Sequence, residues 1–347
     1  RQSRQVPATP VAAQFIAPGS DAINRVPTGF HRIWYEKPYT GSFLTAFDAI
    51  ISKETRYKER NNTMPNTEHV QTGIAEINGT TLYYEVAGAG HPFVLVHGHL
   101  LDRRSWDDQF AVFAQRYRVI RYDQRCFGDS GLITKGKLYS DRQDLYELMQ
   151  FLGIESAYLM GVSGGGALAI DFTLEHPEMV DALIPVTAGV SGYRPSEEVM
   201  QKHPDVVRMY TSLNEAFEKH DIARAVEVSL ELWTDGPGRL PRQAAPGVRE
   251  RVREMTTRNW ERSDDEAQSE TPPAPLEPPA VGRLSQIGVP TLVILGEWDG
   301  PNPLEQLTAE IPGAKKVIMA ETAHHPFMEK PAEFNQLVLD FLGSLQS

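Results

Sequence analysis

Gly161-Val-Ser-Gly-Gly165 is the stretch of sequence that decides the fold. It fits the pattern G-x-S-x-G, with an apolar strand pattern before it at residues 157–160 and a helical pattern after it at residues 167–175. Glycines on both sides of a serine allow a sharp, strained turn that lifts the hydroxyl above a sheet, and the N-terminus of the next helix favours negative charge there. The stretch therefore predicts a strand, a tight turn and a helix, with Ser163 as a nucleophile. The alternative is a glycine-rich structural turn in which the serine has no chemical role.

The residues around this turn alternate between strand and helix patterns. Residues 73–77 and 81–86 are β-rich and are separated by Asn78-Gly79, a strong hairpin signal because both residues tolerate positive φ angles. Near-continuous apolar runs follow, of the kind typical of parallel strands covered on both faces; they are residues 93–96, 118–122, 157–160, 182–186, 291–295 and 316–319. Helical patterns occupy residues 141–152, 167–175 and 331–345. The sequence therefore predicts an α/β fold with a doubly wound, mostly parallel sheet and no internal repeat.

One long interval departs from this alternation. Residues 192–284 contain helical patterns without a convincing strand, and they end in a proline-rich stretch that is typical of a stiff linker. We expect these residues to form a helical cap inserted into the sheet domain. The core is then expected to consist of residues 64–191 and 285–347.

The first 63 residues differ from the rest in charge. They carry nine Lys and Arg against five Asp and Glu and show no sustained periodicity. We interpret residues 1–63 as an N-terminal extension that is flexible or loosely docked. The alternative is an arm that docks on the core through Trp34, Tyr35 and Phe43.

Composition excludes several classes of protein. No run of the 347 residues approaches the ~20 apolar residues needed to cross a bilayer, so no membrane partner is expected. The net charge of −12 argues against nucleic acid as a partner, because Lys and Arg supply most of the affinity for phosphates. The single cysteine, Cys126, cannot form an internal disulfide, and the N-terminus lacks the pattern of a secretory signal. A cytoplasmic location is therefore expected, and the oligomeric state is not predicted.

A serine nucleophile requires a base to remove its proton and an acid to orient that base. Glu297 and Asp299 follow the predicted strand at residues 291–295, and therefore lie at the edge where open parallel sheets place their sites. We take Asp299 as the acid. Glu297 is interpreted as a turn residue, with a shared role as the alternative.

Two adjacent histidines, His324 and His325, follow the last predicted strand. The chain order Ser, Asp, His is the one expected for this topology, and the ordinary pKa of histidine suits a general base. Both rings cannot point at Ser163, so one is the base and the other lines the pocket or supports its neighbour; these residues alone leave the choice open. A metal site from His325 and Glu329 is disfavoured because Pro326 argues against a helix there.

The loop His97-Gly-His-Leu100 follows the predicted strand at residues 93–96. We expect the backbone amide of His99 to lie opposite that of Gly164, so that together they stabilise an oxyanion, with Gly98 and Leu100 beside them. His97 precedes the nucleophile in the chain and is interpreted as a residue that braces this loop.

With these four elements in order, residues 64–347 resemble the α/β-hydrolase superfamily. They are most similar to its lactonase and esterase members related to 3-oxoadipate enol-lactonase. The matching stretches are residues 97–98, 102–106, 122–125, 127–130, 161–165, 296–299 and 324–331. The resemblance implies the α/β-hydrolase fold with a helical cap between the sixth and seventh strands, which fits residues 192–284.

The resemblance also selects one of the two histidines. In the family the histidine usually stands five residues before the Glu of a Glu-Lys-Pro sequence, here Glu329, and this spacing favours His324. Two departures stand out. Cys126 occupies a position that looks like glycine in the family, which implies strain and a thiol in a loop near the site. Val162 and Gly164 flank the serine where relatives often have other residues.

These observations predict a serine hydrolase that needs neither a metal nor another cofactor. Ser163 is expected to attack a carbonyl while His324 takes its proton and Asp299 orients His324. The expected substrate is a small or medium carboxylic ester or lactone. Aromatic cap residues are candidates for the pocket, with ordinary cap packing as the alternative; they are Trp233, Tyr210 and Trp260.

Two other functions fit the same residues. One is carbon–carbon bond hydrolysis or perhydrolase chemistry with the same triad. The other is a small-molecule receptor without turnover, which is disfavoured because the Ser163, Asp299 and His324 positions are all filled.

Overall fold

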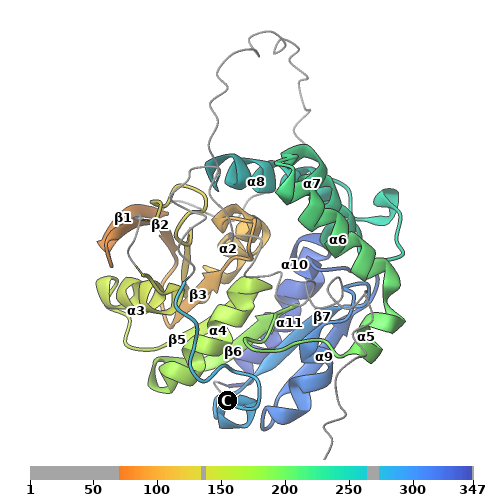
Figure 1. Ribbon diagram of the computed structural model, residues 1–347. Helices are drawn as coiled ribbons and strands as arrows, with labels where there is room; N and C mark the ends of the chain where they lie inside the picture. The colour runs from red at the N-terminus through yellow and green to blue at the C-terminus, as the bar shows by residue number, and fades with distance from the viewer. Residues whose placement is uncertain (1–69, 134–137, 264–272, 346–347) are drawn as a thin grey trace, which may run out of the picture.

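A single mostly parallel sheet of eight strands forms the centre of the protein (Figure 1). The computed structural model describes residues 70–133, 138–263 and 273–345, so the predictions for residues 1–63 lie outside the described residues. The strands follow the order β1-β2-β4-β3-β5-β6-β7-β8 across the sheet. Their bounds are β1 Gln71–Ile77, β2 Thr80–Ala87, β3 Pro92–Val96, β4 Arg118–Tyr122, β5 Ala157–Val162, β6 Val180–Val186, β7 Leu292–Gly296 and β8 Lys315–Met319. The predicted α/β fold with a mostly parallel sheet is confirmed.

The sheet opens with the antiparallel hairpin that the sequence predicts. Strands β1 and β2 pair from Gln71 opposite Val86 to Ile77 opposite Thr80. Asn78 and Gly79 form the connection, with φ angles of 47° and 72°. Positive φ at both turn residues matches the twist of a two-residue hairpin, which explains why Asn-Gly marks this position.

The order of strands reverses in the middle of the sheet. β3 pairs in parallel with β4 on one side and with β5 on the other, so the connections that leave β3 and β5 diverge. Open α/β sheets bind ligands at such a reversal, outside the carboxyl ends of the strands. The turn at Ser163 follows β5, and the loop at residues 97–101 follows β3. The topology therefore brings both predicted elements to the same edge.

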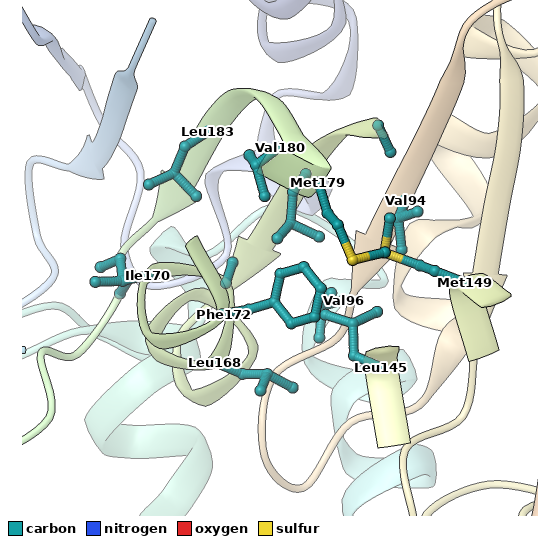
Figure 2. Packing of buried hydrophobic residues seen from close by; sticks show 14 of the residues in the cluster. Val94, Val96, Leu145, Met149, Leu168, Ile170, Phe172, Met179, Val180 and Leu183 are labelled. Atoms are coloured by element: carbon teal, nitrogen blue, oxygen red, sulfur yellow. The ribbon is translucent and has the colours of Figure 1, made fainter. Parts of the chain in front are cut away.

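Side chains of alternate strand residues build a core on each face of the sheet. In β3, Val94 and Val96 point into one cluster, whereas Phe93 and Leu95 point into the other. The first cluster includes residues of α3 (Asp141–Phe151) and α4 (Gly164–Glu175), among them Leu145, Met149, Leu168 and Phe172 (Figure 2). The second includes residues of α2 (Asp107–Phe113) and α11 (Pro331–Gly343). Coverage of both faces explains the near-continuous apolar runs of the central strands.

The segment between β6 and β7, residues 192–284, is here named the β6–β7 insertion. Its described residues contain helices and turns and contribute no strand to the sheet. The helices are α5 (Glu197–Lys202), α6 (Pro204–Glu218), α7 (Ile222–Ser229), the π-helix Leu230–Asp235, the short 3-10 helices Pro241–Gln243 and Leu284–Gln286, and α8 (Val248–Ser263). Figure 1 shows α6, α7 and α8 grouped at one end of the molecule. Arg251 of α8 pairs with Asp108 of α2 across 2.6 Å, which joins this group to the core.

The chain ends with short helices around β8. They are α9 (Pro303–Leu307), the 3-10 helix Thr308–Glu310, α10 (Pro326–Glu329) and α11. Two further 3-10 helices, Arg103–Trp106 and Pro177–Met179, lie earlier in the core. Within the described ranges, every helix is too short or too polar to span a membrane.

Candidate active site

The predicted tight turn places Ser163 between the end of β5 and the start of α4. Ser163 has φ 54° and ψ −120°, a conformation that L-residues rarely adopt. The turn requires glycine on both sides of Ser163. A Cβ on Gly161 would lie 2.2 Å from the Gly165 carbonyl oxygen, and a Cβ on Gly165 would lie 2.2 Å from the His97 carbonyl oxygen. The amide of Ser163 donates to the Val186 carbonyl across 2.9 Å. Ser163 is therefore held at the carboxyl edge of the sheet.

The predicted acid and the histidine chosen by the family spacing form a hydrogen-bonded pair. His324 Nδ1 lies 2.5 Å from Asp299 Oδ1. Asp299 follows β7 and His324 follows β8, two adjacent parallel strands. A second hydrogen bond, from Asn302 Nδ2, reaches Asp299 Oδ2 across 3.1 Å. Because a carboxylate accepts at Nδ1–H, Nε2 of His324 is the nitrogen left to act as a base.

Thr187 connects the serine side of the site to the histidine side. Its hydroxyl donates to the His324 carbonyl across 3.0 Å, and its amide donates to the Ile294 carbonyl across 2.8 Å. Thr187 directly follows Val186, which accepts the Ser163 amide. Among the described residues, the hydrogen bonds of His324 include Asp299 but not Ser163 Oγ. In enzymes without substrate such bonds are often long and tighten only on binding, so this geometry is compatible with a base role.

Backbone strain is concentrated at this edge. Ser163, Thr187 and Leu100 have φ angles of 54°, 42° and 69°, although none of them is glycine. A residue in such a region costs on the order of 1–3 kcal/mol and persists only where its surroundings hold it. Three such residues on neighbouring loops are the pattern expected of a functional site rather than of ordinary connections.

The loop after β3 lies against Ser163 as the sequence predicts. A Cβ on Gly98 would be 3.3 Å from Ser163 Cβ, and a Cβ on Gly164 would be 2.7 Å from two ring atoms of His99. The His99 ring also stacks on Phe127, with ring centroids 6.2 Å apart. The structure therefore brings Gly98, His99 and Gly164 together around Ser163. Their assignment as oxyanion residues stays a prediction.

His97 braces this loop. His97 Nδ1 lies 2.8 Å from the Gly98 carbonyl oxygen. Its Nε2 accepts a hydrogen bond from the Gln124 amide across 2.9 Å. An acceptor role at Nε2 places the proton on Nδ1. Burial lowers the pKa of His97, which favours this neutral form. The ring therefore joins the loops after β3 and β4, as the sequence interpretation expected.

Buried charges hold the same two loops further from Ser163. Arg103 pairs with Asp123 across 2.5 Å and with Glu85 across 2.8 Å, while the Asp129 amide donates to Asp123 across 2.8 Å. Although burial opposes it, hydrogen bonds from Arg103 and Arg121 hold the pKa of Glu85 below its ordinary value. The charged stretches that carry the family resemblance therefore fix loop positions.

Two of the three aromatic residues proposed for the pocket lie beside the His324–Asp299 pair. The Trp233 ring centroid is 6.3 Å from that of His324, and the Trp233 carbonyl accepts the His324 amide across 3.1 Å. The Tyr210 ring is 6.3 Å from the Trp233 ring. Burial, assisted by the Asp299 carboxylate, raises the pKa of Tyr210, which keeps its hydroxyl neutral. Trp260 instead stacks on Phe217, with centroids 4.1 Å apart, inside the core of the insertion.

His325 and Glu329, the residues considered for a metal, take other places. The ring of His325 is 4% exposed and packs edge-on to Phe327, and burial lowers its pKa well below the ordinary value. Glu329 accepts the Ala323 amide across 2.6 Å and pairs with Arg239 across 3.2 Å. In the described part of the chain, no group of three or more His, Cys, Asp or Glu is placed to hold a metal ion.

Sequence reasoning missed several residues that support the site. Asn302 stands three residues after the predicted acid Asp299, and this closeness is a signal that could have found it; Thr187 directly follows β6 but is near no predicted site residue in the sequence. Asn259 and Arg239 come from the insertion and bind core residues that are distant in the sequence. Asn259 binds Leu100, 159 residues away, and Arg239 binds Glu329, 90 residues away. Nothing in their local sequence marks them.

Glu297 has the turn role that the sequence suggested. Its carboxylate accepts the Glu321 amide across 2.7 Å and does not contact His324 among the described hydrogen bonds. Cys126 adopts a φ of 75°, which confirms the expected strain at the position where the family has glycine.

A cavity of about 340 Å³ lies away from Ser163, on the insertion between α6 and α7. Its charged side chains pair with one another, as Arg208 with Asp205 and Arg224 with Glu231. These charges are already paired, and none of the predicted site residues lines the cavity. The candidate active site is therefore the strand edge at Ser163 rather than this cavity.

Comparison with known proteins places this geometry in a family. Residues 93–337 match the Alpha/beta hydrolase family. A carboxylesterase of Bacillus subtilis is 27% identical over 270 residues, covering 72% of this chain and 79% of the relative. A 2-hydroxy-6-oxononadienedioate/2-hydroxy-6-oxononatrienedioate hydrolase of Paraburkholderia phymatum is 27% identical over 296 residues, covering 81% of this chain and 99% of the relative.

Solved structures agree with the sequence relatives. The enol-lactonase from Burkholderia xenovorans LB400 matches with a TM-score of 0.58 and 25% identity, covering 78% of this chain and 100% of the other. The thermophilic esterase from Thermogutta terrifontis matches with a TM-score of 0.60 and 24% identity, covering 80% and 100%, and supports the fold. Since the sheet, the strained turn after β5 and a family match over most of the length coincide, this chain belongs to the α/β hydrolase family.

Proposed function

We propose that the protein is a serine hydrolase that cleaves a small or medium carboxylic ester or lactone through an acyl-enzyme. The observation that carries the proposal is the His324–Asp299 hydrogen bond of 2.5 Å, which lies at the same sheet edge as the strained Ser163. A strained serine gains nothing from its conformation unless a base is near, and a histidine held by a carboxylate is such a base.

The proposed reaction has two halves. Ser163 Oγ attacks the substrate carbonyl carbon while His324 Nε2 takes the hydroxyl proton, and Asp299 stabilises the imidazolium that forms. The amides of His99 and Gly164 hold the negative oxygen, and the positive end of α4 assists. His324 then gives its proton to the leaving alkoxide, so the ester C–O bond breaks. Water, deprotonated by His324, then attacks the acyl carbon, and His324 returns the proton to Ser163 Oγ as the bond between Oγ and the acyl carbon breaks, which releases the carboxylic acid.

The surroundings support an apolar or aromatic substrate. Trp233 flanks His324, with its ring centroid 6.3 Å from that of the histidine ring. Two similar proteins, a carboxylesterase and an enol-lactonase, are named for substrates of this class. We further propose that the β6–β7 insertion acts as a cap over the site, with the core at residues 64–191 and 285–347 as the sequence analysis divides them.

Carbon–carbon bond hydrolysis is the second candidate. The relative from Paraburkholderia phymatum, whose match covers 81% of this chain, is named as a hydrolase of 2-hydroxy-6-oxononadienedioate and 2-hydroxy-6-oxononatrienedioate. The same triad positions would serve that reaction, with a carbon leaving group in place of an alkoxide. Turnover of such a 2-hydroxy-6-oxo diacid faster than of any ester would establish carbon–carbon bond hydrolysis over the first proposal.

A panel of p-nitrophenyl esters and lactones of graded acyl length tests the proposal. We expect the parent to turn over short or medium acyl chains, and Ser163→Ala to lose about 10⁴-fold or more in kcat, since the three residues act as a unit. Ser196→Ala, which removes a hydroxyl that caps α5 on the insertion, is the matched control and should keep parental activity. Ser163→Ala within tenfold of the parent would exclude Ser163 from the mechanism.

Reaction with a labelled fluorophosphonate separates an enzyme from a receptor. A serine hydrolase forms a covalent bond to the probe at Ser163, so the label should appear in the parent and be absent from Ser163→Ala. A parent that binds esters but takes up no label would instead support a small-molecule receptor without turnover.

A further inference from the structure

Asn259, in α8 of the insertion, makes three hydrogen bonds to core loops. Its Nδ2 donates to the carbonyls of Leu100 and Leu101, across 3.1 and 3.0 Å. Its Oδ1 accepts the Gly128 amide across 3.0 Å. The side chain is 1% exposed. One buried amide therefore joins the loop after β3, the loop after β4 and the insertion.

The direction of the Asn259 amide is fixed by its partners. An amide NH₂ donates and an amide oxygen accepts. The reverse orientation would set the oxygen against two carbonyls and the NH₂ against an N–H, leaving three buried groups without a partner. Because a buried polar group without a hydrogen-bond partner destabilises the folded state, the orientation described is the only one that satisfies the site.

The loop that Asn259 holds is a strained turn. The Leu101 amide donates to the Gly98 carbonyl across 3.2 Å, so residues 98–101 form a four-residue turn with His99 and Leu100 at its centre. Leu100 has φ 69°. A turn with positive φ at its third residue normally has Gly or Asn there, because a larger side chain is strained. Leucine at this position must be held by contacts outside the turn.

Those contacts come from the insertion. The Leu100 side chain is 7% exposed and packs in the apolar cluster of the insertion, which includes Leu213, Val228 and Trp260. Burial of the leucine side chain is favourable and offsets the cost of its backbone conformation. Asn259 binds the turn's carbonyls, and Leu100 inserts its side chain. Both interactions require the insertion to be seated on the core.

We propose that Asn259 is a positioning residue through which α8 sets the peptide orientation of the turn at residues 98–101, and with it the amide of His99. This inference rests on the proposed function, in which that amide stabilises the oxyanion. An amide aimed away from the oxyanion loses most of its value, because such donors act only when they are already oriented. The insertion thus controls the chemical step as well as the shape of the pocket.

The rate of fluorophosphonate labelling at Ser163 tests the proposal, since this reaction also places negative charge on an oxygen beside the nucleophile. Asn259→Ala removes all three hydrogen bonds. Asn259→Asp keeps the acceptor for the Gly128 amide and the size of the side chain, but it sets an oxygen against the Leu100 and Leu101 carbonyls. We expect both variants to label 10- to 100-fold more slowly than the parent, below the ~10²–10³ expected for losing one donor outright. The probe concentration for half-maximal rate should change less than threefold.

Arg258→Gln is the matched control. Arg258 precedes Asn259 on α8 and ties it to the core through Asp129, across 2.5 Å, without touching residues 98–101. This variant should label within twofold of the parent. The pH midpoint of labelling should be the same in all variants, because none contacts His324 or Asp299. Melting temperatures, measured on the same samples, show that each is folded at the assay temperature.

Each outcome decides between the inference and the proposed function. If the parent labels and the Asn259 variants label at the parental rate, the inference is wrong and the proposed function stands. Equal slowing in Arg258→Gln would also overturn the inference, because it would show general loosening of α8. A parent that takes up no label contradicts the proposed function and the inference together.

Discussion

Asn302 holds the carboxylate oxygen of Asp299 that His324 does not use. Asn302 Nδ2 donates to Asp299 Oδ2 across 3.1 Å, while His324 Nδ1 lies 2.5 Å from Oδ1. The same side chain accepts the Leu304 amide across 2.9 Å and so caps the start of α9. Because one asparagine binds both the acid and the next helix, α9 fixes the plane of the Asp299 carboxylate and the direction in which it holds His324.

Replacing Asn302 should reduce catalysis in two distinguishable ways. We expect Asn302→Ala to lower kcat three- to tenfold with little change in KM, because Asp299 keeps His324 but loses its second partner. Asn302→Asp keeps the acceptor for the Leu304 amide but adds a negative charge beside the pair, which favours the protonated imidazole. The acidic limb of the pH–rate profile should therefore move to higher pH in Asn302→Asp and stay in place in Asn302→Ala. Identical pH–rate profiles for the two variants would show that Asn302 does not influence the proposed base, His324.

The two histidines should contribute unequally. His324→Ala is expected to approach the loss of Ser163→Ala, because it removes the only proposed base. His325→Ala should keep kcat within tenfold of the parent and change mainly KM, since His325 is packed beside Phe327 rather than bound to Asp299. Steady-state kinetics on the best ester of the panel measure both. A larger kcat loss in His325→Ala would reverse the assignment.

The thiol of Cys126 should be nearly inert in the folded protein. Burial raises the pKa of this thiol to about 12, from an ordinary value of 9.0. At pH 8 the thiolate fraction then falls on the order of 10³-fold, and the thiolate is the reactive form. We expect slow reaction with a disulfide reagent in buffer and rapid reaction of one thiol in denaturant, because the chain has a single cysteine. Rapid modification of the folded protein would contradict the raised pKa of this thiol.

Asp171 should make the free energy of unfolding fall as pH rises. Burial raises the pKa of this carboxyl in α4 from 3.8 to about 6, although Ser191 donates to it across 2.7 Å. The folded state therefore binds the proton more tightly than the unfolded state. This contribution is fully present below about pH 4 and is lost as pH rises to about 6. The shift corresponds to about 3 kcal/mol.

Asp171→Asn removes this titration while its side-chain oxygen can still accept from Ser191. Its melting temperature relative to the parent should rise between pH 4 and pH 7. Thermal unfolding at closely spaced pH values measures the difference, and Asp205→Asn, which alters an exposed carboxylate on α6, is the control. A constant difference across this range would show that folding does not raise the pKa of Asp171.

The local pattern around Ser163 was enough to predict the strand, the turn and the helix. The reason is steric, because no side chain fits at Gly161 or Gly165 and only a glycine-rich sequence can make the turn. The choice between His324 and His325 could not be made in the same way, since neighbours in the chain share one local pattern. The family spacing selected His324, and the hydrogen bond to Asp299 is consistent with that selection.

Contacts between distant segments could not be predicted. Asn259 lies in a helix rich in Arg and Glu, where a polar residue gives no signal of burial, yet it is 1% exposed. Trp260, its neighbour, was considered for the pocket and is packed against Phe217 instead. Hydrophobic periodicity indicates that a side chain is buried, but it does not indicate which element covers it.

The buried pair of Arg239 and Glu329 limits how this protein can be recombined with its relatives. Arg239 belongs to the insertion, and Glu329 holds the Ala323 amide next to His324. A chimera that exchanged residues 192–284 alone would leave Glu329 buried without its cation, a loss of roughly 3–5 kcal/mol. Recombination at the ends of the insertion would therefore separate Arg239 from Glu329. A library of exchanged insertions needs to retain Arg239 or to exchange Glu329 together with the insertion.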